Sequence, residues 1–182
     1  MSCDLTLGRK EPCKDSVGGL KAFYFANFNA SIFNEFTETE GVIDSLLEAP
    51  TTPIELYKYE LRNGGHSLED ANEISSENGT SFVTSTLTAI IKKLDAATRE
   101  ELQLATFGRP HVIVEDYNGN YLLLGLENGC DVQVNQVTGG AMGDLSGYNL
   151  TVTSQERQLS RFVDATIIGD NNQTSIVEGT AI

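Results

Sequence analysis

One stretch restricts the fold of this chain more than any other: a glycine-rich loop at residues 139–147 that runs directly into an alternating segment. The apolar positions of that segment are Tyr148, Leu150 and Val152, and the polar positions are Asn149, Thr151 and Thr153. A period of two indicates a β-strand with one buried face and one solvated face. None of these side chains resembles a nucleophile, a metal ligand or a general base, so the stretch predicts architecture rather than catalysis.

Strand patterns recur along the rest of the chain. Residues 20–28 are rich in aromatic side chains, and residues 81–91 alternate between aliphatic side chains and threonine, which fits a strand. That threonine face suits solvent or a neighbouring subunit equally well. The dipeptide Asn118-Gly119 predicts a hairpin turn within residues 112–126, where Gly125 allows a close backbone approach. Further strands are predicted at residues 32–36, 54–61, 130–134 and 159–163, with weaker candidates at 167–168 and 175–177.

Three segments carry more specific signals. The apolar phase changes within residues 54–61, which indicates a bulge or burial on both faces. Residues 62–79 are polar and contain two Asn-Gly dipeptides, which predicts a long loop or hairpin tip. One helix is predicted to begin at Asp95 or Thr98 and to end at Phe107, with Gly108 as a left-handed cap.

Seven or eight strands and one helix predict a mainly β fold. We expect a β-sandwich or partly closed barrel with one flanking α-helix and a long β-hairpin or loop. The core domain is expected at residues 17–164, with an N-terminal arm at residues 1–16 and a C-terminal arm at residues 165–182 that packs on a neighbour or is loosely held.

Charge narrows the possible partners. The 182-residue chain has a formal net charge of −14 at pH 7, and eleven of its 26 acidic residues lie in residues 35–77. Such a surface repels phosphate backbones and anionic membranes, so sequence-specific nucleic-acid binding and basic-patch membrane binding are disfavoured. No apolar run approaches a membrane span, residues 1–16 do not resemble a secretory signal, and the three cysteines are expected to be free thiols.

The search for chemistry finds no catalytic constellation. His66 and His111 are far apart in sequence and form no zinc motif. The acidic residues near 69–77 lack the ordered spacing of a calcium loop, so a solvated acidic segment is the preferred interpretation over a metal site. We therefore expect no enzyme activity, no metal and no cofactor.

The order of these features resembles a known family. A strand with a long acidic hairpin (residues 54–91) precedes the helix (95–107), two strands follow around Asn118-Gly119, and a closing strand reads Gly143-Asp144-Leu145-Ser146-Gly147-Tyr148-Asn149-Leu150-Thr151-Val152-Thr153, followed by Glu156. This series resembles the tail tube (major tail) proteins of tailed bacteriophages. The resemblance implies a β-sandwich that assembles into hexameric rings, which stack into a tube whose inner wall is a continuous barrel of strands. It also implies contacts between subunits or rings through residues 54–91, 1–16 and 165–182.

The resulting expectation is a structural virion protein of the tail, assembled in the host bacterial cytoplasm, whose acidic lumen conducts DNA during ejection without binding its sequence. The candidates for lumen-facing residues are Glu55, Glu60, Glu73 and Glu77. Expected partners are other copies of the chain and tail proteins such as a terminator, tape measure or sheath, and no membrane. The alternatives are a tail terminator, connector or baseplate ring protein of the same fold. A β-sandwich carbohydrate-binding module is less favoured because the chain has no Trp for stacking on sugars.

Overall fold

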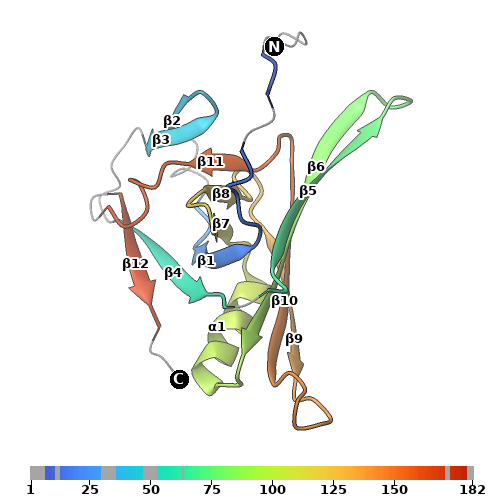
Figure 1. The fold of residues 1–182 in the computed structure, drawn as a ribbon, viewed down its shortest axis with the longest axis vertical. Helices are drawn as coiled ribbons and strands as arrows, with labels where there is room; N and C mark the ends of the chain where they lie inside the picture. The colour runs from blue at the N-terminus through green and yellow to red at the C-terminus, as the bar shows by residue number, and fades with distance from the viewer. Residues whose placement is uncertain are drawn as a thin grey trace.

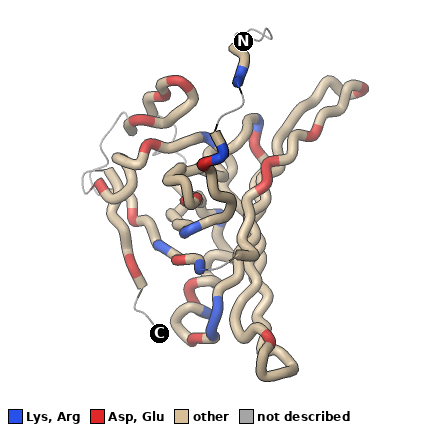
Figure 2. The backbone as a smooth tube through the Cα atoms, in the orientation of Figure 1, with Lys and Arg blue, Asp and Glu red and all other residues tan. Residues whose placement is uncertain are grey.

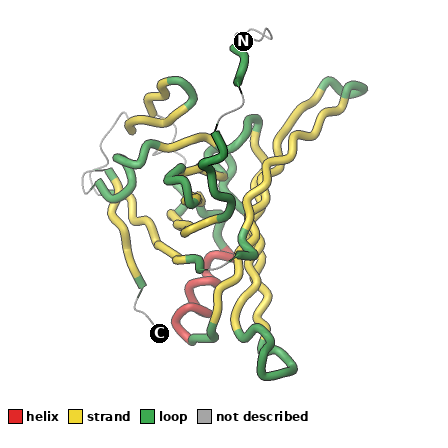
Figure 3. Tube along the Cα trace, viewed as in Figure 1, coloured by secondary structure: helices red, strands yellow, loops and turns green. Residues whose placement is uncertain are grey.

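The computed structural model describes residues 7–10, 13–29, 36–46, 53–62, 64–170 and 173–179. These residues form two β-sheets and one helix, and neither sheet closes into a barrel (Figure 1). Strand dominates the trace, and the helix lies beside the lower part of the smaller sheet (Figure 3). The predicted mainly β fold with two sheets and one flanking helix is confirmed.

The larger sheet has eight strands and contains the first and the last strand of the described chain. Strands β12 and β4, and strands β11 and β3, pair in parallel, whereas the other neighbours are antiparallel. In spatial order the strands are β12 (Thr174–Glu178), β4 (Ile54–Glu60), β1 (Leu20–Ala26), β7 (His111–Asp116), β8 (Tyr121–Leu124), β11 (Arg161–Val163), β3 (Val42–Leu46) and β2 (Phe36–Thr39).

The smaller sheet has four antiparallel strands. In spatial order they are β5 (Ser67–Ser75), β6 (Thr80–Lys92), β10 (Gly147–Glu156) and β9 (Asp131–Val137). Strand β10 pairs along its whole length with β6, from Gly147 opposite Lys92 to Glu156 opposite Val83. Its even-numbered residues are buried from Tyr148 to Ser154, and the odd-numbered ones between them are half-buried, which confirms the predicted alternation.

Of the two alternatives predicted for residues 62–79, a long loop or a hairpin tip, the structure shows the hairpin. Residues 67–75 form strand β5, and only residues 76–79 make the turn into β6. The sequence of β5 has no clean alternation because most of its residues are exposed on both faces. It is a strand because the regular, alternating β6 offers a template along nine register pairs, from Ser67–Thr88 to Ser75–Thr80.

The helix α1 (Ala96–Phe107) begins as one of the two predicted starts requires. The Asp95 carboxylate accepts a hydrogen bond from the Thr98 backbone N–H at 3.1 Å, so Asp95 is the N-cap residue. The prediction for Gly108 is wrong: its φ is −89°, not left-handed, and its N–H donates to the Leu104 carbonyl at 3.1 Å. An ordinary i to i−4 hydrogen bond thus ends the helix without a left-handed residue.

Both faces of the larger sheet carry apolar clusters. The inner cluster fills the space between the sheets and includes Phe23, Leu102 and Leu150. The outer cluster lies on the opposite face and includes Tyr24 and Leu56. Strand β4 contributes Ile54 and Leu56 to the outer cluster, whereas Tyr57 and Tyr59 pack against the inner one. Because its pairing with β1 shows no register shift, burial on both faces explains the phase change, and no bulge is present there.

The predicted Asn-Gly hairpin is confirmed. Gly119 and Gly125 each adopt a backbone conformation that favours glycine. Strands β7 and β8 flank the turn, in which Gly119 has φ +83°. Gly125 has φ +69°, and a Cβ there would lie 2.6 Å from the Cys130 Sγ atom, so the predicted close approach is real.

The terminal segments differ from one another. Within the predicted N-terminal arm, residues 7–10 and 13–16 are exposed and form no strand or helix. Within residues 165–182, residues 174–178 form β12, whereas the strand candidate at 167–168 is a turn in which Ile167 N–H donates to the Asp164 carbonyl at 3.1 Å. Of the strand predicted at 32–36, only Phe36 lies within the described residues, as the first residue of β2.

Candidate assembly surface

The outward face of the four-stranded sheet is a continuous polar surface, which we call the polar face. The registers of the four strands, all of which the structure describes completely, define its members. They are Ser67, Glu69, Ala71, Glu73 and Ser75 on β5; Thr80, Phe82, Thr84, Thr86, Thr88, Ile90 and Lys92 on β6; Gly147, Asn149, Thr151, Thr153 and Gln155 on β10; and Asp131, Gln133, Asn135 and Val137 on β9.

The polar face is ordered in rows across the sheet. Thr86 lies opposite Thr153, and the same row ends in Glu69 on β5 and Asp131 on β9. The next row joins Ser67, Thr88, Thr151 and Gln133. In these two rows hydroxyls lie inside the row, whereas elsewhere on the face β6 also contributes the apolar Phe82 and Ile90. The one cation at these strand positions is Lys92, at the end of β6 opposite Gly147.

Two edges of this sheet are open. Strand β5 ends the sheet on one side and β9 on the other, and no other described strand pairs with either of them. The β5–β6 hairpin also extends well beyond the larger sheet (Figure 1). Near its tip Ile74 is 71% exposed, although it lies on the same side of the sheet as the buried Val83. Unpaired edges and exposed apolar side chains of this kind are typical of surfaces that contact another chain.

The glycine-rich loop before β10 has a defined shape. The Asp144 carboxylate accepts hydrogen bonds from the backbone N–H groups of Gly140 at 2.9 Å and Ala141 at 2.8 Å. The bonds from Ala141 and Gly140 lower the pKa of Asp144. A Cβ at Gly147 would lie 2.1 Å from the Ile91 carbonyl oxygen, so only glycine allows β10 to enter the sheet there. At the tip of this loop, Met142 is fully exposed.

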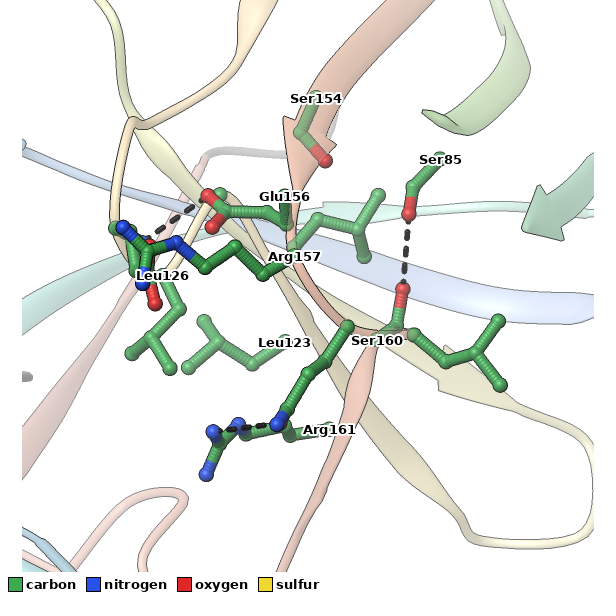
Figure 4. Close-up of a pocket in the computed structure, with 13 residues that line it drawn as sticks. Ser85, Leu123, Leu126, Ser154, Glu156, Arg157, Ser160 and Arg161 are labelled. Carbon is green, nitrogen blue, oxygen red and sulfur yellow. Dashed lines mark hydrogen bonds and ion pairs between the residues drawn. The ribbon is translucent and has the colours of Figure 1, made fainter. Parts of the chain in front are cut away.

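Hydrogen bonds join the base of the β5–β6 hairpin to the segment that connects β10 of the smaller sheet to β11 of the larger sheet. Asp70 on β5 accepts hydrogen bonds from the backbone N–H and the hydroxyl of Ser160, at 2.8 and 2.9 Å. The Ser160 hydroxyl also contacts the Ser85 hydroxyl at 3.3 Å (Figure 4). The pocket beside this contact holds about 20 Å³, far below the volume of a small-molecule site. The contact of Asp70, Ser160 and Ser85 therefore connects the two sheets, and the pocket beside it is too small for a ligand.

The most buried carboxylate belongs to a compact polar cluster on the outer side of the larger sheet. Glu115 is 4% exposed, forms an ion pair with Lys21 and accepts a hydrogen bond from the Tyr24 hydroxyl at 2.8 Å. Burial and the hydrogen bond to Glu115 raise the pKa of Tyr24, and the hydrogen bond to Glu115 raises the pKa of Lys21. Each charge thus has a partner, which is how a folded protein accommodates buried polar groups.

The two histidines and the two cysteines within the described residues do not gather into a site. His111 is fully buried, its Nε2 accepts from the Asn29 N–H at 3.2 Å, and burial lowers its pKa. His66 Nδ1 accepts from the Ile90 N–H at 3.1 Å. Cys13 and Cys130 are free, and burial raises the pKa of Cys130 to about 12, which disfavours a reactive thiolate. Among the described residues, no three His, Cys, Asp or Glu side chains form a metal-binding group.

The four candidate carboxylates lie in two separate regions. Glu55 and Glu60 are on β4 of the larger sheet, where they contact Tyr57 and Lys58 respectively. Glu73 belongs to the polar face and accepts a hydrogen bond from Thr84 at 2.9 Å, and Glu77 lies in the hairpin turn. Acidic positions line this hairpin (Figure 2).

The sequence did not predict that the carboxylates of Glu69 and Asp131 share the polar face. They lie in one row only because β6 and β10 bring β5 and β9 into a single register. The signal available in the sequence was the threonine alternation of β6, which identifies the solvated face of that strand but not its neighbours.

Comparisons with known proteins add no relative: no protein-family model, no curated protein and no solved structure matches this chain. In the part of the chain that the structure describes, no helix is long and apolar enough to cross a membrane.

Proposed function

We propose that this protein is the structural subunit of a phage tail tube, in which copies associate side by side into rings and the rings stack. The observation that carries this function is the four-stranded sheet, which has one apolar face, one polar face and two open edges. The strand order and the closing Gly-Asp-Leu-Ser-Gly-Tyr-Asn-Leu-Thr-Val-Thr segment, which resemble the tail tube family, support the same function.

Ring formation follows from the edges. When β9 of one copy pairs with β5 of the next, both rows of unpaired backbone groups gain partners, and the aggregation hazard of an open edge disappears. Repeating this contact around an axis joins the four-stranded sheets into one closed wall. The apolar face of each sheet stays covered by its own larger sheet, so the polar face is the one that lines the channel.

The chemistry of the polar face suits the passage of DNA. Its central strands present mainly hydroxyls and amides, with Phe82 and Ile90 as the apolar exceptions, and its carboxylates are Glu69, Glu73 and Asp131. Affinity for a phosphate backbone comes mainly from Lys and Arg, which release counterions on contact, and this wall has only Lys92 at one end. We assign the wall to these residues, whereas Glu55 and Glu60 lie on β4 of the other sheet, on opposite faces of that strand.

The protein works through assembly in this function, with no catalytic step and no cofactor. Its partners are other copies of itself and the proteins that end, fill or sheathe a tail. DNA passes through the channel without sequence-specific contacts.

Electron microscopy tests the proposal directly. Negative-stain images of the purified full-length protein, taken across a concentration series, are expected to show hollow rings or tubes. Particles that stay monomeric at every concentration would refute the tube. Single rings that never stack, present once per particle in virions, would instead identify a tail terminator or connector.

A further inference from the structure

The chain contains four Asn-Gly pairs, at residues 63–64, 78–79, 118–119 and 128–129. An asparagine followed by glycine is prone to deamidation, in which the backbone nitrogen of the glycine attacks the side-chain amide carbon, because glycine has no Cβ to shield its nitrogen. Asparagine is accordingly among the thermolabile residues of proteins. Asn63 lies outside the described residues, so three of the pairs can be compared in the structure.

Exposure and backbone geometry do not separate these three pairs. Asn78, Asn118 and Asn128 are all exposed to solvent. The glycines that follow them all have a left-handed backbone, with φ of +64°, +83° and +76° respectively. The difference lies in the two groups that react, which are the side-chain amide of the asparagine and the backbone N–H of the glycine. A hydrogen bond to either group must open before the nitrogen can reach the amide carbon.

Both reacting groups of the pair at 118–119 are held by hydrogen bonds. The Asn118 side chain accepts from the Val17 N–H at 2.9 Å and donates to the Val17 carbonyl at 2.8 Å. It also donates to the Asp116 carboxylate at 3.2 Å. The Gly119 N–H donates to the Asp116 carbonyl at 3.4 Å. The folded turn therefore protects Asn118 from attack.

The pair at 128–129 is held in the same way and is also crowded. The Asn128 side chain donates to the Gln155 carbonyl at 2.9 Å, and the Gly129 N–H donates to the Gly125 carbonyl at 3.1 Å. A Cβ at Gly129 would lie 2.5 Å from the Arg109 carbonyl oxygen. Closing a ring across this peptide would require both hydrogen bonds to open and packed neighbours to move.

Neither reacting group is held in the pair at the tip of the β5–β6 hairpin. The Asn78 N–H donates to the Ser75 hydroxyl at 3.3 Å, which fixes the turn but involves neither the side-chain amide nor the Gly79 N–H. Within the described residues, that amide and the Gly79 N–H have no hydrogen-bond partner. A Cβ at Gly79 would meet no atom within 4 Å, and the hairpin projects beyond the larger sheet (Figure 1). Water and hydroxide therefore reach both groups freely.

We propose that Asn78 is a site of spontaneous deamidation that changes the charge of the β5–β6 hairpin tip. Hydroxide removes the proton of the Gly79 N–H, and that nitrogen attacks the Asn78 side-chain amide carbon. The new carbon–nitrogen bond replaces the bond to the side-chain nitrogen, which takes up a proton from water and leaves as ammonia, so that a cyclic imide remains. One water molecule then opens the imide. The net change converts an amide and water into a carboxylic acid and ammonia, with no oxidant and no enzyme.

The two products alter the tip in different ways. Opening the imide at the side-chain carbonyl leaves an ordinary aspartate, whereas opening it at the backbone carbonyl leaves isoaspartate, whose main chain is one methylene longer. Both products add a negative charge directly beside Glu77, in a turn that the pair of Ser75 and Thr80 closes. The longer main chain is expected to loosen that closing pair. This change requires no ring or tube, so it stands apart from the proposed assembly.

The test follows all three asparagines in one sample. Full-length protein, diluted below the concentration at which it assembles, is incubated at mildly alkaline pH in water enriched in the heavy oxygen isotope, and its proteolytic peptides are analysed by mass spectrometry. The peptide with Asn78 is expected to exchange ammonia for heavy oxygen at least about tenfold faster than those with Asn118 and Asn128, because hydrogen bonds hold both reacting groups of the latter two pairs. The rate at Asn78 is expected to rise with pH, because hydroxide must remove the Gly79 proton.

Unfolding is the control for local sequence. In concentrated urea the three rates are expected to converge, because the hydrogen bonds of Asn118 and Asn128 are lost and the same dipeptide remains. Asn78→Gln, whose longer side chain closes a less favourable ring, is expected to remove the acidic form that appears on ion-exchange chromatography of the folded protein. Asn128→Gln is the matched variant and is expected to leave that form unchanged. Equal native rates, or a native order that persists in urea, would overturn the assignment to the hairpin tip.

Discussion

The two sheets of this protein use the same secondary structure for different purposes. In β1 every residue except Lys21 is buried, so this strand belongs to the core on both faces. In β10 the buried residues alternate with half-buried Asn149, Thr151 and Thr153. The larger sheet therefore fixes the fold, and the smaller sheet adds a surface. The difference teaches that continuous apolar runs identify the strands buried on both faces here, whereas strict alternation identifies the strands with one polar face.

The largest expected effect contrasts the two faces of β10. Leu150→Asp places a carboxylate at a fully buried position of the inner cluster and is expected to unfold the subunit. Thr151→Asp, one residue further on the polar face, is expected to give folded protein. Circular dichroism and urea denaturation of both variants check this. A stable Leu150→Asp protein would show that the two faces have been assigned the wrong way round.

A core truncation in the larger sheet is expected to have the next largest effect. The Phe23 ring is fully buried and stacks on the Tyr59 ring with centroids 5.0 Å apart. Phe23→Ala is expected to lower the free energy of unfolding by about 3–5 kcal/mol because it leaves a cavity between the sheets. Chemical denaturation measures the loss, and Thr86→Ala on the polar face serves as the comparison, with an expected change of about 0.5 kcal/mol or less. Equal losses in the two variants would contradict the division into scaffold and wall.

A smaller loss of stability is expected from removing the hydrogen bond between β10 of the smaller sheet and the start of α1. The Tyr148 hydroxyl on β10 donates a hydrogen bond to the Asp95 carbonyl at 2.9 Å, directly at the start of α1. Tyr148→Phe keeps the buried ring and removes this bond, so it is expected to cost about 1 kcal/mol. Thermal denaturation gives the change in stability, and hydrogen exchange at the first turn of α1 is expected to increase. Unchanged exchange there would mean that packing of Leu102 alone positions the helix.

The smallest expected effect concerns the turn between β7 and β8 and depends on pH. Burial raises the pKa of Asp116, but hydrogen bonds from Asn120 and Asn118 outweigh it, so that the pKa falls below the ordinary 3.8. The unfolded chain then binds a proton more readily, and the stabilisation from Asp116 is fully present above about pH 4 and lost as pH falls through the folded value. Asp116→Asn is expected to flatten this part of the stability profile between pH 5 and pH 2, measured by denaturant midpoints, by less than about 1 kcal/mol. An unchanged slope would assign the acid sensitivity to other carboxylates.

The sequence predicted those elements whose signals are local. The alternation of β6 and β10, the Asn118-Gly119 turn and the Asp95 cap each depend on a few neighbouring residues, and each is present in the structure. Strand β5 was missed because its side chains are mostly exposed and its conformation is imposed by β6. A nonlocal cause of this kind leaves no period in the segment itself.

The candidate surface was only partly predictable for the same reason. The polar alternation of β10 and the threonine alternation of β6 were visible, but the rows of the polar face depend on the registers of four strands. Carboxylates chosen from the most acidic region of the chain therefore fell on two sheets, with Glu55 and Glu60 on β4 and Glu73 on β5. Charge density along a sequence shows where acid is abundant, whereas only the register shows which carboxylates share a face.

The contact between Asp70 and Ser160 has a mechanical consequence. The β5–β6 hairpin extends beyond the larger sheet (Figure 1). Near its base, Asp70 is hydrogen-bonded to Ser160 in the segment that connects β10 to β11. A force applied at the hairpin tip is therefore divided between two routes, one along the backbone ladder of β6 and β10 and one through Ser160 into the larger sheet. These two hydrogen bonds therefore tie β5 to the larger sheet independently of its pairing with β6.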